Sequence, residues 1–303
     1  MQGKVCVITG ATSGIGLAAA EALARLGGRI VLIGRNPERG ARAIERLRRR
    51  VPNAQTSIHY ADLERMGEVR RLGAELRSAY QRVDVLINNA GAQFERRRLT
   101  EEGLERTFAL NHMAYFLLTY ELRERLAAAA PARVINVASE AHEGARLDFS
   151  DLNIEHGYSG WVAYSRSKLA NILFTRELAG RLRSTGVTAN ALHPGFAATR
   201  FGYNNPGLFR IKLFLVKRLA ISPEEGAKTV VHLATAPELA FATGGYYVRS
   251  KMADPSEAAQ DGSAARRLWH LSSKFAGIAP AQWSIAGRDS AAVDSCRSPD
   301  LLG

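Results

Sequence analysis

Short apolar runs alternate with longer amphipathic segments over the first two thirds of the chain. The apolar runs are rich in Val and Ile and carry few charges, which is typical of parallel strands buried on both faces. They cover residues 4–9, 29–33, 56–60, 83–87, 133–138 and 187–192. Between them, apolar spacing predicts helices over residues 14–26, 37–50, 64–80, 101–128 and 161–184. This alternation predicts an α/β fold, a doubly wound parallel sheet of about seven strands with helices on both faces.

The last third of the chain is less regular, but no long linker or internal repeat divides it. We therefore expect a single domain over residues 1–280, with a last strand at residues 244–248. Ser222-Pro223-Glu224-Glu225 is typical of a helix start: a cap, a proline in the first turn, then acids. Residues 281–303 are rich in Ala, Ser, Gly and Asp, which predicts an irregular or disordered tail. No uncharged apolar run reaches the roughly 18 residues that cross a bilayer.

The formal net charge is +12, and much of it comes from arginine. The arginines are scattered over amphipathic segments and not interleaved with aromatic residues, which favours solvated helix faces over a nucleic-acid surface. The sequence holds two cysteines, Cys6 and Cys296. With so few cysteines and no segment that resembles a signal peptide before the first apolar run, we expect a reduced, cytoplasmic protein.

A glycine-rich turn follows the first predicted strand. Gly10 permits a tight turn, Gly14 lets the main chain approach a pyrophosphate, and Gly16 lets the next helix pack closely on the sheet. The start of that helix offers free N–H groups to phosphates. Because the turn lies between a strand and a helix in a βαβ unit, it predicts a dinucleotide site. The other members of this site are Thr12, Ser13 and Ile15.

The turn has the pattern TGxxxGIG, and further motifs follow other predicted strands. With these motifs the chain resembles the short-chain dehydrogenase/reductase family up to about residue 277, and the resemblance implies a Rossmann-type fold. Each motif follows the carboxyl end of a strand, the edge at which open α/β sheets bind ligands. The resemblance implies that the cofactor contacts these motif residues: Asp62, Leu63, Asn89, Ala90, Gly91, Pro194, Gly195 and Thr199.

The choice between NAD and NADP depends on the end of the second strand. An NAD site needs a carboxylate there to bind both ribose hydroxyls, and that carboxylate repels a 2′-phosphate. Gly34 stands where NAD-preferring members of the family usually carry Asp. Arg35 follows it with a planar guanidinium suited to phosphate, and Arg39 is close enough in sequence to reach the same charge. These residues predict NADP(H) as the cofactor.

Tyr164 and Lys168 lie four positions apart in a predicted helix and therefore share one face. Hydride transfer to a carbonyl needs a proton donor at the oxygen, and an unperturbed tyrosine, with a pKa of about 10, is a poor one at neutral pH. A nearby ammonium lowers that pKa, so the pair is the candidate catalytic centre. By resemblance both also contact the cofactor, Ser139 hydrogen-bonds the substrate oxygen, and Asn111 holds a water near the lysine.

The segment 196–220 is expected to cover the substrate. It is apolar and aromatic, with Phe201, Tyr203 and Phe209 among its members, and such a lid suits a bulky lipophilic alcohol, aldehyde or ketone. The same pattern suits a core-facing amphipathic helix, and its interleaved basic residues suit peripheral contact with a membrane surface. His142 and His193 flank the site in sequence without metal-ligand partners at suitable spacing, so no metal site is predicted.

Several sequence segments resemble the retinol dehydrogenase-like and WW-domain oxidoreductase-like branch of the family. Among them are Ala138-Ser139-Glu140-Ala141-His142 and His193-Pro194-Gly195. The resemblance implies an NADP-dependent oxidoreductase acting on a retinoid-, steroid- or polyketide-like carbonyl or alcohol. Two alternatives stay open: reduction of a carbon–carbon double bond, as in protochlorophyllide reductases, and an NADP-binding sensor or scaffold without turnover. The family commonly assembles through its long helices, which implies a homodimer or homotetramer.

Overall fold

The computed structural model of this chain describes residues 1–195 and 221–283. In these residues one eight-stranded sheet has the order β3-β2-β1-β4-β5-β6-β7-β8. Neighbouring strands are parallel from β3 to β7, and the β7–β8 pair is antiparallel. The predicted doubly wound parallel sheet is confirmed, with a short edge strand added. The strands are β1 (Val5–Thr9), β2 (Arg29–Gly34), β3 (Thr56–Tyr60), β4 (Val85–Asn88), β5 (Ala132–Val137), β6 (Val187–His193), β7 (Tyr246–Val248) and β8 (Lys251–Ala253).

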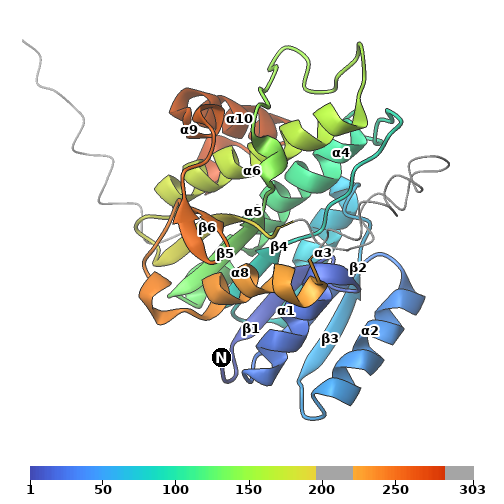
Figure 1. The fold of residues 1–303 in the computed structure, drawn as a ribbon, viewed down its shortest axis with the longest axis vertical. Coiled ribbons are helices and arrows are strands. Elements are labelled where there is room, and N and C mark those ends of the chain that lie inside the picture. Colours follow the sequence, from blue (N-terminus) through green and yellow to red (C-terminus); the bar gives the residue numbers. More distant parts are fainter. Residues whose placement is uncertain (196–220, 284–303) are drawn as a thin grey trace, which may run out of the picture.

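Helices cover both faces of this sheet (Figure 1). One face carries α1 (Gly14–Arg25), α2 (Pro37–Arg50) and α8 (Pro223–Thr235). The other carries α3 (Met66–Ala79), α5 (Ala114–Ala128) and α6 (Gly160–Arg181), with α10 (Gly262–Phe275) packed against α6. The shorter helical segments are α4 (Arg106–Phe108), η1 (Ala109–Met113), η2 (Glu140–His142), η4 (Pro237–Leu239), α9 (Glu257–Gln260) and η5 (Pro280–Trp283).

The central strands are apolar throughout because successive side chains enter two different cores. Val7 and Ile33 pack into the core beneath α3, α5 and α6. Their neighbours Ile8 and Leu32 pack into the core beneath α1, α2 and α8. All four are fully buried. A strand that is covered on both faces has no solvent side, which is why its sequence lacks the polar alternation of a half-exposed strand.

The single helix predicted over residues 101–128 is wrong in its first part. Gly103 adopts a φ of +74°, and the helix starts only at Arg106, after Glu105 has capped it. The carboxylate of Glu105 accepts hydrogen bonds from the N–H groups of Thr107 and Phe108, both at 2.9 Å. Next comes the π-helical turn η1, which contains Asn111, and then α5. Apolar periodicity does not register the extra residue of a π turn, a feature that is frequent at functional sites.

The C-terminal part of the described chain packs onto α5 and α6. Trp283 belongs to the tail predicted over residues 281–303, yet its ring lies 5.1 Å from Phe116 and 4.4 Å from Trp269. The rest of that tail lies outside the described residues, as do the predicted lid (196–220) and Thr199. Trp269 also stacks on Phe174 at 5.8 Å. Self-association through α5 and α6 would therefore have to use the parts of these helices that this cluster leaves uncovered.

A buried histidine connects α10 to the π-helical turn η1. His112 is fully buried, and its Nε2 lies 2.8 Å from Ser272 Oγ in α10. The imidazole packs 4.9 Å from Phe108 and 5.9 Å from Phe174. Burial disfavours the charged ring and lowers the pKa of His112 from 6.5 to about 3. The folded protein therefore keeps this histidine neutral at pH values at which an exposed histidine is protonated.

We expect His112 to make folding sensitive to acid. Below pH 6.5 the unfolded chain binds a proton at His112 that the folded chain does not. The contribution of neutral His112 to the free energy of unfolding is therefore fully present above that pH and is lost as pH decreases towards 3. The expected loss is about 1 kcal/mol per pH unit relative to a His112→Gln variant, measured by urea unfolding between pH 6 and pH 4.5. The exposed His270→Gln is the control and should keep the wild-type pH dependence. Equal slopes for wild type and His112→Gln would show that the folded ring protonates freely.

Candidate functional site

The turn after β1 has the geometry of a phosphate-binding site. Gly10 and Gly14 adopt φ values of +66° and +58°, which side-chain-bearing residues rarely tolerate. A Cβ on Gly16 would lie 2.7 Å from the Gly10 carbonyl oxygen, so only glycine allows α1 to start this close to the strand. Ser13 makes no side-chain cap, and the first turn of α1 has no acidic residue. The first amide N–H groups of α1 are thus left for an anionic ligand.

Hydrogen bonds tie this turn to the segment that follows β4. The Thr9 hydroxyl accepts from the N–H groups of Asn89 at 2.8 Å and Ala90 at 3.0 Å. The Asn89 side-chain amide donates to the Thr9 carbonyl at 2.8 Å. A Cβ on Gly10 would lie only 2.9 Å from the Ala90 Cα, so the two segments are in direct contact. Thr9 was not among the predicted site residues, although its place at the end of an apolar strand was a signal for a polar role.

A cavity of about 800 Å³ opens at this edge of the sheet. Of the predicted site residues that the structure describes, all line it except Gly16, which packs α1 on the sheet, and Asn111, which lies behind it. The predicted residues that line the cavity are Gly10, Thr12, Ser13, Gly14, Ile15, Arg35, Arg39, Asp62, Leu63, Asn89, Ala90, Gly91, Ser139, Tyr164, Lys168, Pro194 and Gly195. Motifs that are far apart in the sequence therefore meet in one cavity.

Tyr164 and Lys168 lie on one buried face of α6, next to the end of β5. Lys168 Nζ donates a hydrogen bond to the Val137 carbonyl oxygen at 2.9 Å. Burial lowers the pKa of Lys168 from 10.5 to about 7. Burial also raises the pKa of Tyr164 from 10.0 to about 12, against the opposing effect of its hydrogen bond with Ser139. The pKa of Tyr164 is therefore raised where the spacing of the pair predicted a lowered one, and desolvation of the phenolate is the largest cause.

The side chain of Asn111 holds the segment after β4 against α6. Its Oδ1 accepts from Ala92 N–H at 2.9 Å, and its Nδ2 donates to the Ala92 carbonyl at 2.9 Å and to Ser167 Oγ at 2.9 Å. A Cβ on Gly91 would lie 3.2 Å from Asn111 Oδ1 and 3.4 Å from Lys168 Nζ. Both polar atoms of the amide thus bond to the protein, and the water-holding role implied by resemblance stays a prediction.

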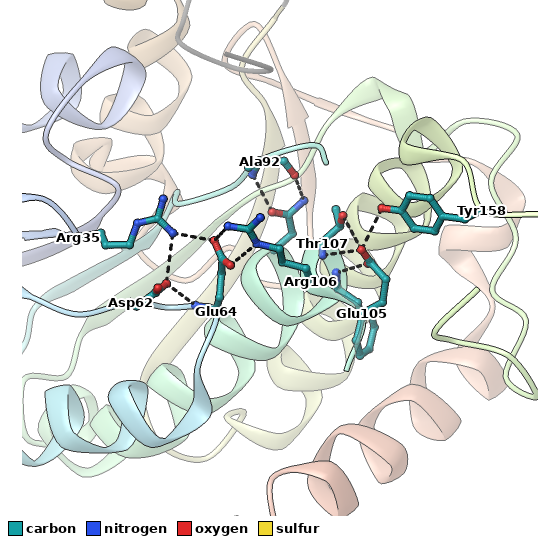
Figure 2. Close-up of polar contacts among 10 residues, drawn as sticks. Arg35, Asp62, Glu64, Ala92, Glu105, Arg106, Thr107 and Tyr158 are labelled. Atoms are coloured by element: carbon teal, nitrogen blue, oxygen red, sulfur yellow. Dashed lines mark hydrogen bonds and ion pairs between the residues drawn. The ribbon is translucent and has the colours of Figure 1, made fainter. Parts of the chain in front are cut away.

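The carboxylate of Glu105 supports the start of α4 and was not identified from the sequence. Figure 2 shows the Glu105 carboxylate between Thr107 and Tyr158. The Tyr158 hydroxyl donates to Glu105 at 3.0 Å and lies 2.9 Å from the carbonyl oxygen of Phe94, a residue of the cavity wall. Glu105 is buried, with 1% of its surface exposed. The only signal in the sequence was an acid close to a helix start, a position that many exposed residues also occupy.

The two histidines beside the site have different places. His142 is buried: its Nδ1 pairs with the Ser139 carbonyl oxygen at 2.7 Å, and its Nε2 accepts from Ser256 N–H at 3.1 Å. It therefore braces Ser139 from behind and does not line the cavity. His193 lines the cavity, and its Nδ1 accepts from Glu140 N–H at 3.1 Å. Burial is the main cause of the lowered pKa of His193.

At the end of β2, a side chain at position 34 would collide with Thr12. A Cβ on Gly34 would lie 2.5 Å from Thr12 Cγ2. The nearby Arg35 Nη1 pairs with Glu64 at 2.8 Å and lies 3.5 Å from Asp62. Arg39 lines the same cavity, and within the described part of the chain its guanidinium makes no ion pair. Two cations and a closely packed glycine thus mark the part of the cavity beside α2.

Comparison with known proteins identifies relatives over nearly the whole chain. A family model described as short chain dehydrogenase matches residues 4–206. Retinol dehydrogenase 13 of Homo sapiens is 40% identical over 288 residues, which cover 92% of this chain and 86% of that protein. A Streptomyces sp. (strain C5) protein provisionally named daunorubicin C-13 ketoreductase DnrU is 41% identical over 280 residues, covering 91% and 94%. The Pseudomonas aeruginosa RhlG/NADP active-site complex superposes with a TM-score of 0.65, 27% identity, and coverage of 81% and 94%.

We expect a methyl group at position 34 to disturb dinucleotide binding through Thr12. In Gly34→Ala the new Cβ collides with Thr12 Cγ2, so the Thr12 side chain, the turn that carries it or the end of β2 must shift. The dissociation constant for NADPH, measured by fluorescence titration, should rise about tenfold, equivalent to about 1.4 kcal/mol.

The double variant Gly34→Ala/Thr12→Ser removes the colliding methyl and should recover most of the affinity, since the next Thr12 atoms lie 3.7 Å away. Gly67→Ala is the control, because no atom of the described residues lies within 4 Å of a Cβ at that position. Wild-type affinity in Gly34→Ala, or no recovery in the double variant, would contradict the steric explanation.

Proposed function

Because this chain belongs to the short-chain dehydrogenase family, we propose that it is an NADP(H)-dependent oxidoreductase that interconverts a bulky lipophilic carbonyl compound and its alcohol. One observation carries the proposal: Tyr164 and Lys168 lie buried in a single cavity with the phosphate-binding turn of Gly10 and Gly14. A cofactor that binds along that cavity would hold its hydride close to Tyr164, which can donate the proton that the reduction needs.

The residues present fit an NADP(H) molecule. The turn from Gly10 to Gly16 and the start of α1 would hold its pyrophosphate, and Arg35 and Arg39 offer cations to a 2′-phosphate. A side chain at position 34, such as the carboxylate of an NAD-type site, would also collide with the methyl group of Thr12. The relative of known structure that is in complex with NADP supports the same choice.

The chain's own residues supply the proton chemistry. When bound, NADPH supplies the hydride for reduction of the carbonyl carbon. Tyr164, kept protonated by burial, donates its proton to the carbonyl oxygen as negative charge develops there. Ser139 hydrogen-bonds the phenol, lines the cavity and would bind the same oxygen. Lys168 in its ammonium form stabilises the phenolate that remains, and it is held in place by the Val137 carbonyl.

The proposed substrate class follows from the wall of the cavity near Tyr164. Trp161 is 57% exposed, and it lines the cavity together with Phe94, Leu110 and Ala141. An exposed indole beside the catalytic tyrosine favours a large apolar partner. The relatives named for retinol and for daunorubicin have substrates of that kind in their names. We therefore propose retinoid-, steroid- or polyketide-like carbonyl compounds and alcohols.

Mass spectrometry of the products separates the proposed carbonyl reduction from reduction of a carbon–carbon double bond. NADPH binding without turnover on a broad panel would instead support a sensor or scaffold. In the described part of the chain no helix is long and apolar enough to cross a membrane. A cytoplasmic location and a homodimer or homotetramer remain predictions.

We expect purified protein to oxidise NADPH in the presence of lipophilic aldehydes or ketones, and Tyr164→Phe to reduce this activity at least about a hundredfold, the usual contribution of a positioned general acid. The binding of NADPH should change little. Tyr247→Phe is the matched control, since it removes a buried hydroxyl that has no hydrogen-bond partner among the residues the structure describes. Retained turnover in Tyr164→Phe would refute the acid role.

We expect reduction to be lost at high pH as Lys168 loses its proton. Its pKa of about 7 means that the ammonium is present below pH 7 and disappears as pH rises through that value. The apparent kcat/KM for the carbonyl substrate, measured at subsaturating NADPH so that the free enzyme titrates, should decline above about pH 7. The decline of kcat should occur at higher pH, because an anionic cofactor in the cavity favours the charged lysine. A flat profile of kcat/KM from pH 6 to 9 would contradict this role.

A further inference from the structure

Glu64 lies between two arginines beside the part of the cavity proposed for the adenosine end of the cofactor. Its carboxylate pairs with Arg106, through both Nε and Nη2, the latter at 3.1 Å. The same carboxylate accepts from Arg35 Nη1 at 2.8 Å (Figure 2). Glu64 comes directly after the Asp62-Leu63 motif, and neither Glu64 nor Arg106 is among the residues that sequence motifs single out.

Glu64 and Arg106, the more buried pair of this network, are fixed by several contacts. The side chain of Glu64 is 10% exposed and that of Arg106 26% exposed, against 52% for Arg35. The Arg106 guanidinium lies over the Phe94 ring, 3.9 Å from its centroid, and the Arg106 main chain begins α4. Two-pronged pairing of Arg106 with the carboxylate neutralises Glu64 and restricts its rotation. Glu64 is thus a fixed acceptor at the edge of the cavity.

Arg35, the more exposed of the two arginines, uses only part of its guanidinium in this network. Both carboxylates that contact Arg35, those of Glu64 and Asp62, do so at Nη1. Within the described chain, Nε and Nη2 of Arg35 make no hydrogen bond, so one edge of the planar guanidinium is available for two parallel bonds to a phosphate. A flexible arginine that is already held at one nitrogen loses less conformational entropy when a ligand binds.

We propose that Glu64 and Arg106 are positioning residues that hold Arg35 ready for the 2′-phosphate and so set the preference for NADPH over NADH. This inference rests on the proposed function. Glu64 touches no part of the reacting centre and acts through Arg35. Loss of its charge should therefore weaken NADPH binding and leave NADH binding and kcat at saturating NADPH nearly unchanged.

The test is a double-mutant cycle on cofactor affinity. Dissociation constants for NADPH and NADH are measured for wild type, Arg35→Ala, Glu64→Gln and Arg35→Ala/Glu64→Gln. We expect Glu64→Gln to weaken NADPH about tenfold and NADH less than twofold. If Glu64 acts through Arg35, adding Glu64→Gln to Arg35→Ala should cost nothing further. Competition by 2′,5′-ADP should fall in parallel with NADPH, and competition by 5′-AMP should not.

Folding is controlled separately, because Glu64→Gln leaves the partly buried Arg106 without its acid. Glu64→Gln/Arg106→Met removes both charges, and it should show the same selective loss of NADPH with NADH affinity retained. Glu68→Gln is the matched control, an acid of α3 that pairs with Arg71 and does not line the cavity. It should leave both affinities unchanged.

The outcomes separate this inference from the proposed function. Additive losses in the cycle, unchanged NADPH affinity in Glu64→Gln, or tighter NADPH binding would overturn the positioning role, the last by showing that Glu64 withholds Arg35 from phosphate. Equal wild-type affinity for NADPH and NADH, with no selective loss in Arg35→Ala, would overturn the proposed NADP(H) use itself. Selective loss in Arg35→Ala alone would retain that proposal and reject the inference.

Discussion

The hydroxyl of Thr9 joins the two strands at which the order of the sheet reverses. It accepts hydrogen bonds from the N–H groups of Asn89 and Ala90, and the Asn89 amide returns a bond to the Thr9 carbonyl. The ends of β1 and β4 are therefore held together, and the chains that leave them line one cavity. The place of Gly91 against Lys168 follows from this junction, because Gly91 continues the same segment towards α6.

Burial governs the charges at the other end of that cavity. It raises the pKa of Tyr164 to about 12 and lowers that of Lys168 to about 7, so the pair favours an uncharged phenol and a lysine that titrates near neutrality. Desolvation is the largest cause of both shifts, a contribution that the spacing of the pair did not show. An anionic ligand would shift the balance towards the ammonium. Cofactor binding and the protonation of the pair are therefore coupled, which the isolated motif does not reveal.

The sequence alone determined the fold class and identified most of the predicted residues that meet in the cavity. Strand positions follow from short apolar runs, and Tyr164 and Lys168 share a face because they lie four residues apart in a helix. The glycines of the turn are recognisable because the required left-handed geometry restricts the residue type, as at Gly10 and Gly14. These features depend on neighbours within a few positions. Once the parallel order is inferred, the meeting of Gly10, Asp62 and Pro194 at one edge also follows.

Only the tertiary structure decided which polar side chains support that site. Glu64 meets Arg106 across 42 positions, and Ser256 reaches His142 across 114. No local pattern distinguishes such a Glu64 from an exposed acid. The π turn at Asn111 and the packing of Trp283 on α5 escaped prediction for the same reason. Periodicity reports which face of a segment is buried, whereas hydrogen-bond partners and charge balance depend on the distances between segments that only the folded chain specifies.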